Sequence, residues 1–88
     1  MKSIPHVPIV NALLRTTAAR AVTGDCESAF YAKVARGLMT KPIKINSRTT
    51  ALPVREVEAI NAARIRGASE AEIMALVQQL HADRSKAA

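Results

Sequence analysis

The part of this chain that decides its fold is residues 23–48, TGDCESAFYAKVARGLMTKPIKINSR. It begins with a compact turn around Gly24 and continues with a short helical pattern that holds Phe30 and Val34. After Gly37 it ends in a basic, extended segment. A turn, a helix and a β-hairpin in this order are the parts of a winged helix-turn-helix. We therefore predict a mainly helical fold with a small β-hairpin wing, followed by a C-terminal helix.

The positive charge of the chain is concentrated in this half. Residues 1–50 hold eight Lys or Arg and two Asp or Glu, whereas residues 51–88 hold five of each, so the net charge of +6 lies in the first half. No acidic residue interrupts the five basic residues between positions 28 and 50. Such a stretch indicates an anionic partner. With one Phe, one Tyr and no Trp, the chain lacks the aromatic platforms that stack single-stranded bases, so duplex DNA is the expected partner.

The composition excludes several other classes of function. One cysteine leaves no internal disulfide framework, and no Cys/His cluster has metal-ligand spacing. No nucleophile–base–acid arrangement and no phosphate-binding glycine loop occurs, so we expect neither an enzyme nor a cofactor. The start of the chain, MKSIPHVP, is interrupted by prolines and a histidine, unlike a signal peptide. No run approaches the roughly 18 apolar residues of a membrane span. We expect a cytoplasmic, nucleoid-associated protein without membrane contact.

The 88 residues are enough for one small domain. We expect residues 1–12 to form a flexible N-terminal arm, with a short extended piece around residues 8–10. Residues 13–84 should form the DNA-binding domain with its C-terminal helix. Residues 85–88 should form a frayed tail.

Local signals place the first two helices. Thr16 and Thr17 can cap a helix that runs to about Val22, and Gly24 can take a positive φ at its end. Asp25 is the expected N-cap of the second helix, with an acidic residue in the first turn where the helix dipole favours one. The first helix is short and rich in alanine, so it needs tertiary packing to persist.

The second helix should bury Phe30 and Val34, which are four residues apart, and present its opposite side to a partner. After it, residues 41–45 and 49–52 form a plausible hairpin. The Asn-Ser-Arg segment at 46–48 supplies the turn, and β-branched Ile and Thr suit the strands.

Two further helices should complete the domain. Pro53 is expected at the first position of the third helix, whose inner side would hold Val54, Val57, Ile60 or Asn61, and Ile65. Gly67 ends that helix. A capping box at Ser69–Glu72 begins the fourth, which should end near Arg84. Its apolar stripe, Ile73, Leu76, Val77 and Leu80, is first a core face and alternatively the seam of a homodimer.

In its ordered set of motifs, from about Leu13 to Leu80, the sequence resembles the AlpA/excisionase group of small phage-type regulators, whose winged helix is related to that of the MerR regulators. The resemblance rests on Leu14-Arg15, Thr23-Gly24, Ser28, Phe30-Tyr31, Gly37-Leu38, Lys41-Pro42-Ile43-Lys44-Ile45, Arg48 and Glu56-Val57-Glu58-Ala59. It implies a transcriptional regulator or recombination directionality factor that binds DNA near an attachment site. A phage recombinase or RNA polymerase would then be a candidate partner.

The chain departs from this family in its second helix. The family usually has Ser and Arg at the positions of Cys26 and Glu27, and Thr and Arg at those of Ala29 and Ala32. These differences keep a second hypothesis open, in which a degenerate winged helix no longer recognises DNA and binds a protein through its C-terminal helix.

The DNA-binding hypothesis places residues 24–37 in the major groove and the wing, residues 41–48, along the phosphate backbone. Tyr31 would either cover the core edge or bond a phosphate. Ser28 would either support the helix start or contact a base or phosphate. Arg36 would either contact DNA or reach the last carbonyls of its helix. The candidate DNA-binding residues are Ser28, Tyr31, Ala32, Lys33, Arg36, Lys41, Lys44 and Arg48.

Overall fold

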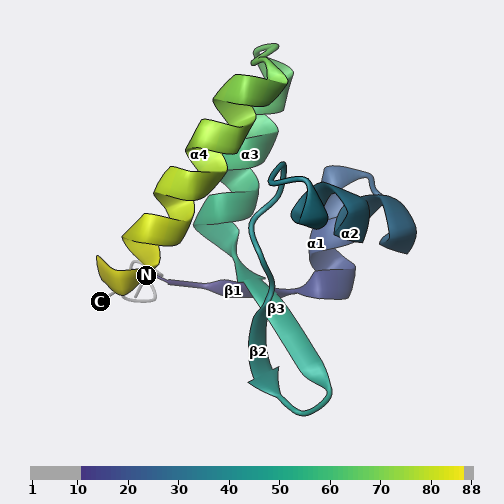
Figure 1. The fold of residues 1–88 in the computed structure, drawn as a ribbon. Coiled ribbons are helices and arrows are strands. Elements are labelled where there is room, and N and C mark those ends of the chain that lie inside the picture. The colour runs from purple at the N-terminus through teal and green to yellow at the C-terminus, as the bar shows by residue number, and fades with distance from the viewer. Residues whose placement is uncertain (1–10, 87–88) are drawn as a thin grey trace, which may run out of the picture.

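The computed structural model describes residues 11–86 of the chain. This part is mainly helical, with four α-helices and a small antiparallel sheet (Figure 1). The elements are β1 (Leu13–Arg15), α1 (Thr16–Thr23), α2 (Glu27–Ala35), β2 (Ile43–Asn46), β3 (Thr49–Pro53), α3 (Val54–Ile65), α4 (Glu70–Asp83) and a 3-10 turn, η1 (Arg84–Lys86). The predicted combination of helices and a small hairpin is confirmed. The extended piece predicted around residues 8–10 lies outside the described residues.

The sheet has three strands in the order β1-β3-β2, one more than the predicted hairpin. β1 pairs with one edge of β3, where Leu14 lies opposite Leu52. β2 pairs with the other edge, where Ile43 lies opposite Ala51. The central position of β3 explains why Ala51, Leu52 and Pro53 are all buried. Pro53, predicted to be the first residue of the next helix, is instead the last residue of β3 and the N-cap of α3.

Two glycines end the first two helices, as predicted. Gly24 takes a φ of 78° and donates its N–H to the carbonyl of Arg20. Gly37 takes a φ of 77°, and its N–H lies 3.2 Å from the Val34 carbonyl oxygen. Residues with a Cβ rarely adopt this left-handed conformation, so glycine lets the chain leave each helix without strain.

The predicted caps at the starts of these helices are wrong. The N-cap of α1 is Arg15, without a side-chain cap bond, and Thr16 and Thr17 lie inside the helix. The Thr16 hydroxyl is instead engaged by a threonine of β3. The N-cap of α2 is Cys26 rather than Asp25. The carboxylate of Asp25 is taken by other side chains across the α1–α2 turn, so it is not available to the first amides of α2.

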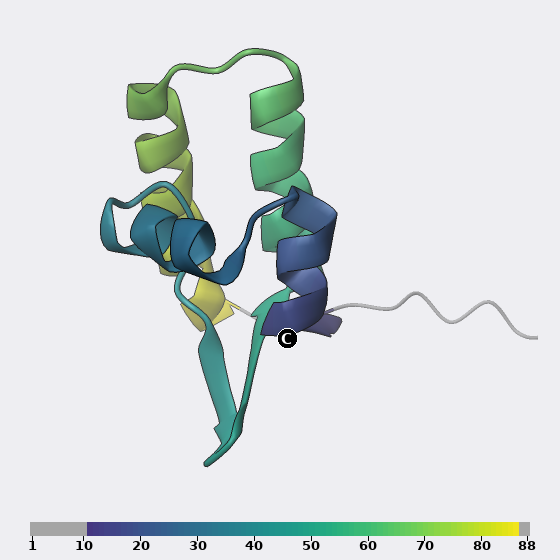
Figure 2. The same ribbon diagram turned by 90° about the vertical axis from the view of Figure 1, so that its right-hand side faces the viewer.

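Helices α3 and α4 run antiparallel and are joined by a short loop, residues 66–69, that contains Gly67 (Figures 1 and 2). The predicted capping box at the start of α4 is confirmed. The Ser69 hydroxyl accepts from the Glu72 N–H at 3.2 Å, and the Glu72 carboxylate accepts from the Ser69 N–H at 2.8 Å. At its other end, α4 continues into η1 rather than fraying immediately after Arg84. Residues 87–88 of the expected tail lie outside the described residues.

The core joins α2, β3, α3 and α4. Its largest fully buried apolar side chains are Phe30, Met39, Leu52, Val57 and Ile60. On α4, Ile73 and Val77 are buried, and Leu76 and Leu80 pack against the same cluster, so the predicted apolar stripe is a core face. Ile65, predicted on the inner side of α3, is 86% exposed. The core position near that end of the helix is occupied by Ala63 instead.

A charged pair also lies in the interior. The Glu56 side chain is fully buried and receives two hydrogen bonds from Arg84, from Nε at 2.8 Å and from Nη2 at 2.7 Å. Arg84 Nη2 also lies 2.7 Å from the Lys41 carbonyl oxygen, and the Lys41 N–H donates to Nε2 of His81 at 3.0 Å. These bonds fasten the end of α4 to the chain just before β2.

Candidate nucleic-acid interface

The outward side of α2 presents three of the predicted site residues to solvent. Ser28, Tyr31 and Ala32 are all exposed, while Phe30 on the inner side is fully buried. The Tyr31 ring packs edge-on against Phe30, with ring centres 5.3 Å apart, and the residue remains 43% exposed. Tyr31 therefore covers the edge of the core and still presents part of its surface to solvent. Ser28 and Ala32 are small, so they allow another molecule to come close to this helix.

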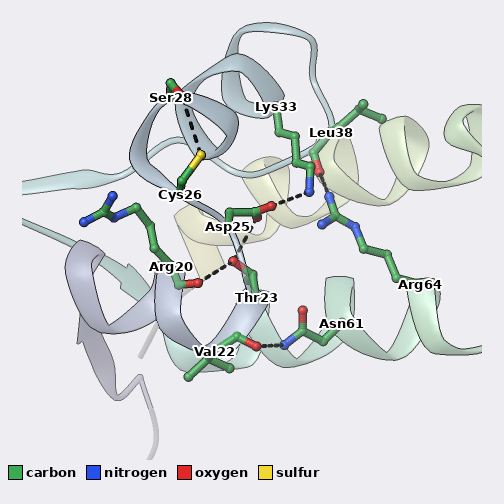
Figure 3. Close-up of polar contacts among 10 residues, drawn as sticks. All are labelled: Arg20, Val22, Thr23, Asp25, Cys26, Ser28, Lys33, Leu38, Asn61 and Arg64. Atoms are coloured by element: carbon green, nitrogen blue, oxygen red, sulfur yellow. Dashed lines mark hydrogen bonds and ion pairs between the residues drawn. The ribbon is translucent and has the colours of Figure 1, made fainter.

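Asp25 and Lys33 set the position of α2 relative to α1. Asp25 lies in the turn between them, where its carboxylate is 2.6 Å from Lys33 Nζ and 2.9 Å from the Thr23 hydroxyl (Figure 3). Burial works against ionisation, but the bonds from Lys33 and Thr23 and the Lys33 charge hold the pKa of Asp25 below its ordinary value. Lys33 was predicted to bind DNA. In the structure its ammonium group is paired with Asp25 within the protein.

Further polar bonds hold the α1–α2 pair and the following loop against α3. Asn61 Nδ2 lies 3.5 Å from the Val22 carbonyl oxygen, and Arg64 Nη2 lies 2.9 Å from the Leu38 carbonyl oxygen (Figure 3). The Val22 oxygen is in the last turn of α1, where an α-helix leaves carbonyl groups without partners, and the Leu38 oxygen is in the loop that follows α2. The orientation of α2 is therefore set by α3 as well as by the apolar core.

Arg36, another predicted site residue, pairs with Glu70 at the start of α4. Its Nη2 atom lies 3.1 Å and 3.3 Å from the two carboxylate oxygens. Both side chains are well exposed, 63% for Arg36 and 66% for Glu70. Exposed pairs of this kind contribute only about 0–1 kcal/mol to stability, so Arg36 can exchange this partner for another anion at little cost.

Cys26, the N-cap of α2, is exposed, and its Sγ lies 3.5 Å from the Ser28 hydroxyl (Figure 3). The bond with Ser28 and the bond from the Ala29 N–H lower the pKa of the Cys26 thiol below its ordinary value. These two bonds favour the thiolate because each places a donor at the sulfur. Cys26 therefore marks the start of α2, the helix that carries Ser28.

The β2–β3 hairpin projects away from the helices (Figures 1 and 2). Lys44 and Arg48 are exposed on it, and Lys41 is exposed at its base. The Asn46 side chain accepts the Arg48 N–H at 3.0 Å, which fixes the turn as an Asx motif. Within residues 11–86, the side chains of Lys41, Lys44 and Arg48 make no ion pair. The positive charge available to a partner is therefore concentrated on the hairpin rather than on α2.

The structure adds one basic residue that was not among the predicted site residues. Arg15, at the end of β1, lies near Arg48, and both line a surface hollow of about 270 Å³. The two arginines are 33 positions apart in the sequence, and antiparallel pairing of β1 with β3 brings them together. No spacing rule in the sequence links them. The signal in the sequence was the dipeptide Leu14-Arg15, one of the motifs of the family resemblance.

Comparisons of the chain with protein-family profiles, with curated proteins and with solved structures give no match. Among the described residues, no helix combines the length and the apolar character that a membrane crossing requires.

Proposed function

We propose that this protein binds duplex DNA as a winged helix-turn-helix protein. In this proposal α1 and α2 are the helix-turn-helix, with α2 entering the major groove. The β2–β3 hairpin is the wing and follows the phosphate backbone. The observation that carries the proposal is the exposed hairpin, whose basic side chains form no ion pair with any residue between 11 and 86, next to a helix pair that presents a small polar face.

The two elements would divide the work of recognition. Lys44 and Arg48 on the hairpin would supply affinity through phosphate contacts, which do not depend on sequence. Ser28 and Tyr31 on α2 would supply hydrogen bonds to base edges or to flanking phosphates, and Ala32 would allow close approach. Arg36 would exchange Glu70 for the DNA, since its ion pair is exposed and weak.

The resemblance to the AlpA/excisionase group extends the proposal to a biological role. We propose a prophage-type transcriptional regulator or recombination directionality factor, with a phage recombinase or RNA polymerase as the protein partner. The support for this role is the set of motifs between Leu14 and Ala59. The order of the elements, a strand, two helices, a hairpin and two helices, is compatible with such a fold.

The ion pairing of the charged residues on and next to α2 favours a second function. Lys33 and Arg36 both have acidic partners within the protein, and the exposed Glu27 adds a negative charge at the start of the helix. A helix with these features would suit a protein-interaction module that no longer recognises DNA.

A salt titration of binding to a generic duplex separates the two functions. Three to four phosphate contacts from the unpaired basic residues predict a slope of log affinity against log salt of roughly −2.7 to −3.6. Lys44→Ala should weaken binding to every duplex equally and reduce that slope by about 1. The matched control is Arg66→Ala, which removes the same charge from the α3–α4 turn, at the end of α3 away from the hairpin. Absence of binding at low salt would favour the interaction module.

Selection from a pool of randomised duplexes tests recognition by α2. We expect an enriched motif whose advantage over random DNA falls in the Ser28→Ala and Tyr31→Phe variants. A lost base contact costs about 1–3 kcal/mol. Lys44→Ala should leave the motif unchanged, because phosphate contacts carry no sequence information. If the motif changed with Lys44 and not with the α2 variants, the roles of the two elements would be reversed.

A further inference from the structure

A hollow lies on the surface where the start of α1 meets the β2–β3 hairpin. Its volume is about 270 Å³, and its lining comes from the β1–α1 junction and from the beginning of β3. The lining residues are Arg15, Thr16, Thr17, Arg48, Thr49 and Thr50. We call it the Arg15–Arg48 hollow. Its lining combines two arginines with four threonines and has no acidic or aromatic residue.

The two arginines are available to a ligand. Within residues 11–86 neither makes an ion pair, in contrast to Lys33 and Arg36. Arg15 Nη2 donates a hydrogen bond to the neutral hydroxyl of Thr49, at 3.4 Å. A guanidinium group presents a planar fork of N–H donors that fits two oxygens of a phosphate. Two forks that line one small hollow favour an oxyanion between them.

The threonines add donors to the same space. The hydroxyls of Thr16 and Thr50 lie 2.7 Å apart, so one donates to the other. The hydroxyl that accepts this bond keeps its own hydrogen, which it can donate to a ligand. Thr17 is exposed beside them, and the first turn of α1 has no acidic residue that would repel an anion. The lining therefore offers several neutral donors besides the two charged ones.

The chemistry of the lining narrows the class of ligand. No aromatic ring is present to stack on a base, and the apolar surface of the lining is limited to threonine methyl groups and the stems of the arginines. A nucleobase would find little to hold it there. A phosphate group matches the donors in both charge and geometry.

We propose that the Arg15–Arg48 hollow binds one phosphate group of the DNA backbone and so anchors the hairpin to the duplex. This inference rests on the proposed DNA-binding function. It adds Arg15 to the interface and gives Arg48 a defined partner. Because both arginines would hold the same phosphate, the loss of either should remove most of the contribution of the pair.

The experiment measures duplex binding by the variants Arg15→Gln, Arg48→Gln and the double variant, at fixed salt and across a salt series. Because a hydrogen bond to a charged group contributes substantially to binding, each single variant should lose duplex affinity by about tenfold or more. The double variant should lose much less than the product of the single losses, and the salt slope should fall by about 1. Arg66→Gln is the control of equal charge. Arg48→Lys, which keeps the charge without the fork, should retain part of the affinity.

A second measurement follows backbone amide signals by NMR while inorganic phosphate is added to the whole chain. The amides of Thr16, Thr17, Thr49 and Thr50 should shift together, and Arg15→Gln should abolish the shifts. Thermal unfolding followed by circular dichroism verifies that each variant is folded.

The outcomes distinguish this inference from the function on which it rests. If wild-type protein binds duplex DNA with the expected salt slope but the arginine variants bind equally well, the hollow is not the anchor and the DNA-binding function stands. If phosphate shifts the four amides but no duplex binds, the hollow takes free phosphate, and both the backbone assignment and the proposed function are wrong. If the affinity loss of the double variant equalled the product of the two single losses, the arginines would make two separate contacts. That result would also contradict the proposal that they share one phosphate.

Discussion

We expect the replacement of Arg84 by alanine to destabilise the protein strongly. Among the partly exposed charged residues between 11 and 86, its loss should reduce the free energy of unfolding most. Arg84 is 24% exposed and holds the fully buried carboxylate of Glu56 through two short hydrogen bonds. Arg84→Ala leaves a charged acid inside the core without a partner, a change that costs about 3–5 kcal/mol in buried pairs. Because Arg84 reaches the surface, its removal opens a path for water to the carboxylate, so we expect the low end, about 3 kcal/mol.

That loss is large relative to the stability of a domain of this size. At roughly 0.05–0.15 kcal/mol per residue, a chain of 88 residues has about 4–13 kcal/mol of folding free energy. Arg84→Ala also removes the bond to the Lys41 carbonyl oxygen and leaves the base of the hairpin with the bond from the Lys41 N–H to His81. We therefore expect weaker DNA binding at temperatures where the variant is still folded.

Urea unfolding followed by far-ultraviolet circular dichroism measures the effect, with the m-value verifying that the two-state description holds. Lys86→Ala is the control two positions away, because it breaks an exposed 3.7 Å pair with Asp83 and should cost less than about 1 kcal/mol. The double change Glu56→Met with Arg84→Met should recover most of the loss, since an apolar pair can replace a buried ion pair. A loss below about 1 kcal/mol for Arg84→Ala, or no recovery in the double variant, would refute the reasoning.

Three further predictions follow from buried or exposed side chains. Burial, with the nearby charge of Arg84, lowers the pKa of His81 below its ordinary value of 6.5, so the unfolded chain takes up the proton first; stability should fall as pH drops below about 6.5. His81→Gln, which can still accept the Lys41 N–H but does not titrate, should be flat between pH 5 and 7 in urea unfolding. Within residues 11–86, the buried hydroxyl of Thr40 has no hydrogen-bond partner, so Thr40→Val should unfold at the same or a higher urea concentration, and a loss above about 1 kcal/mol would reveal a missed partner. Ile65→Gln should change stability by less than about 0.5 kcal/mol, whereas Ile60→Ala should cost about 2–5 kcal/mol, and equal losses in thermal melts would contradict the observed burial.

Most of the helices could be predicted because their signals are local. Gly24 and Gly67 mark helix ends through a backbone conformation that other residues avoid, and the capping box at Ser69 needs only the three residues that follow it. The hairpin also follows from a turn sequence between two β-branched segments. Errors of one position, as at Pro53, arise because strand and helix share a residue at their junction.

The missed elements depend on contacts between distant parts of the chain. β1 has three residues, which is too short for an alternating pattern, and it exists because β3 offers a free edge. The sequence did not predict that Glu56 is buried. An acidic side chain is stable in the core only when a partner neutralises it, and that partner, Arg84, lies 28 positions later in the chain. Ile65 was expected inside from periodicity alone. It is exposed because the core covers Ala63 and leaves the last residue of α3 unpacked.

For the candidate site, the sequence by itself determined which residue types lie on α2 and on the hairpin, and that the excess positive charge belongs to the first half of the chain. Only the tertiary structure decided which of those charges are available to a partner. Lys33 is bound by Asp25 and Arg36 by Glu70, while Arg15 and Arg48 line one hollow without an acidic residue. The physical reason is that charge follows from composition, whereas the pairing of charges depends on distances set by strand register and helix packing.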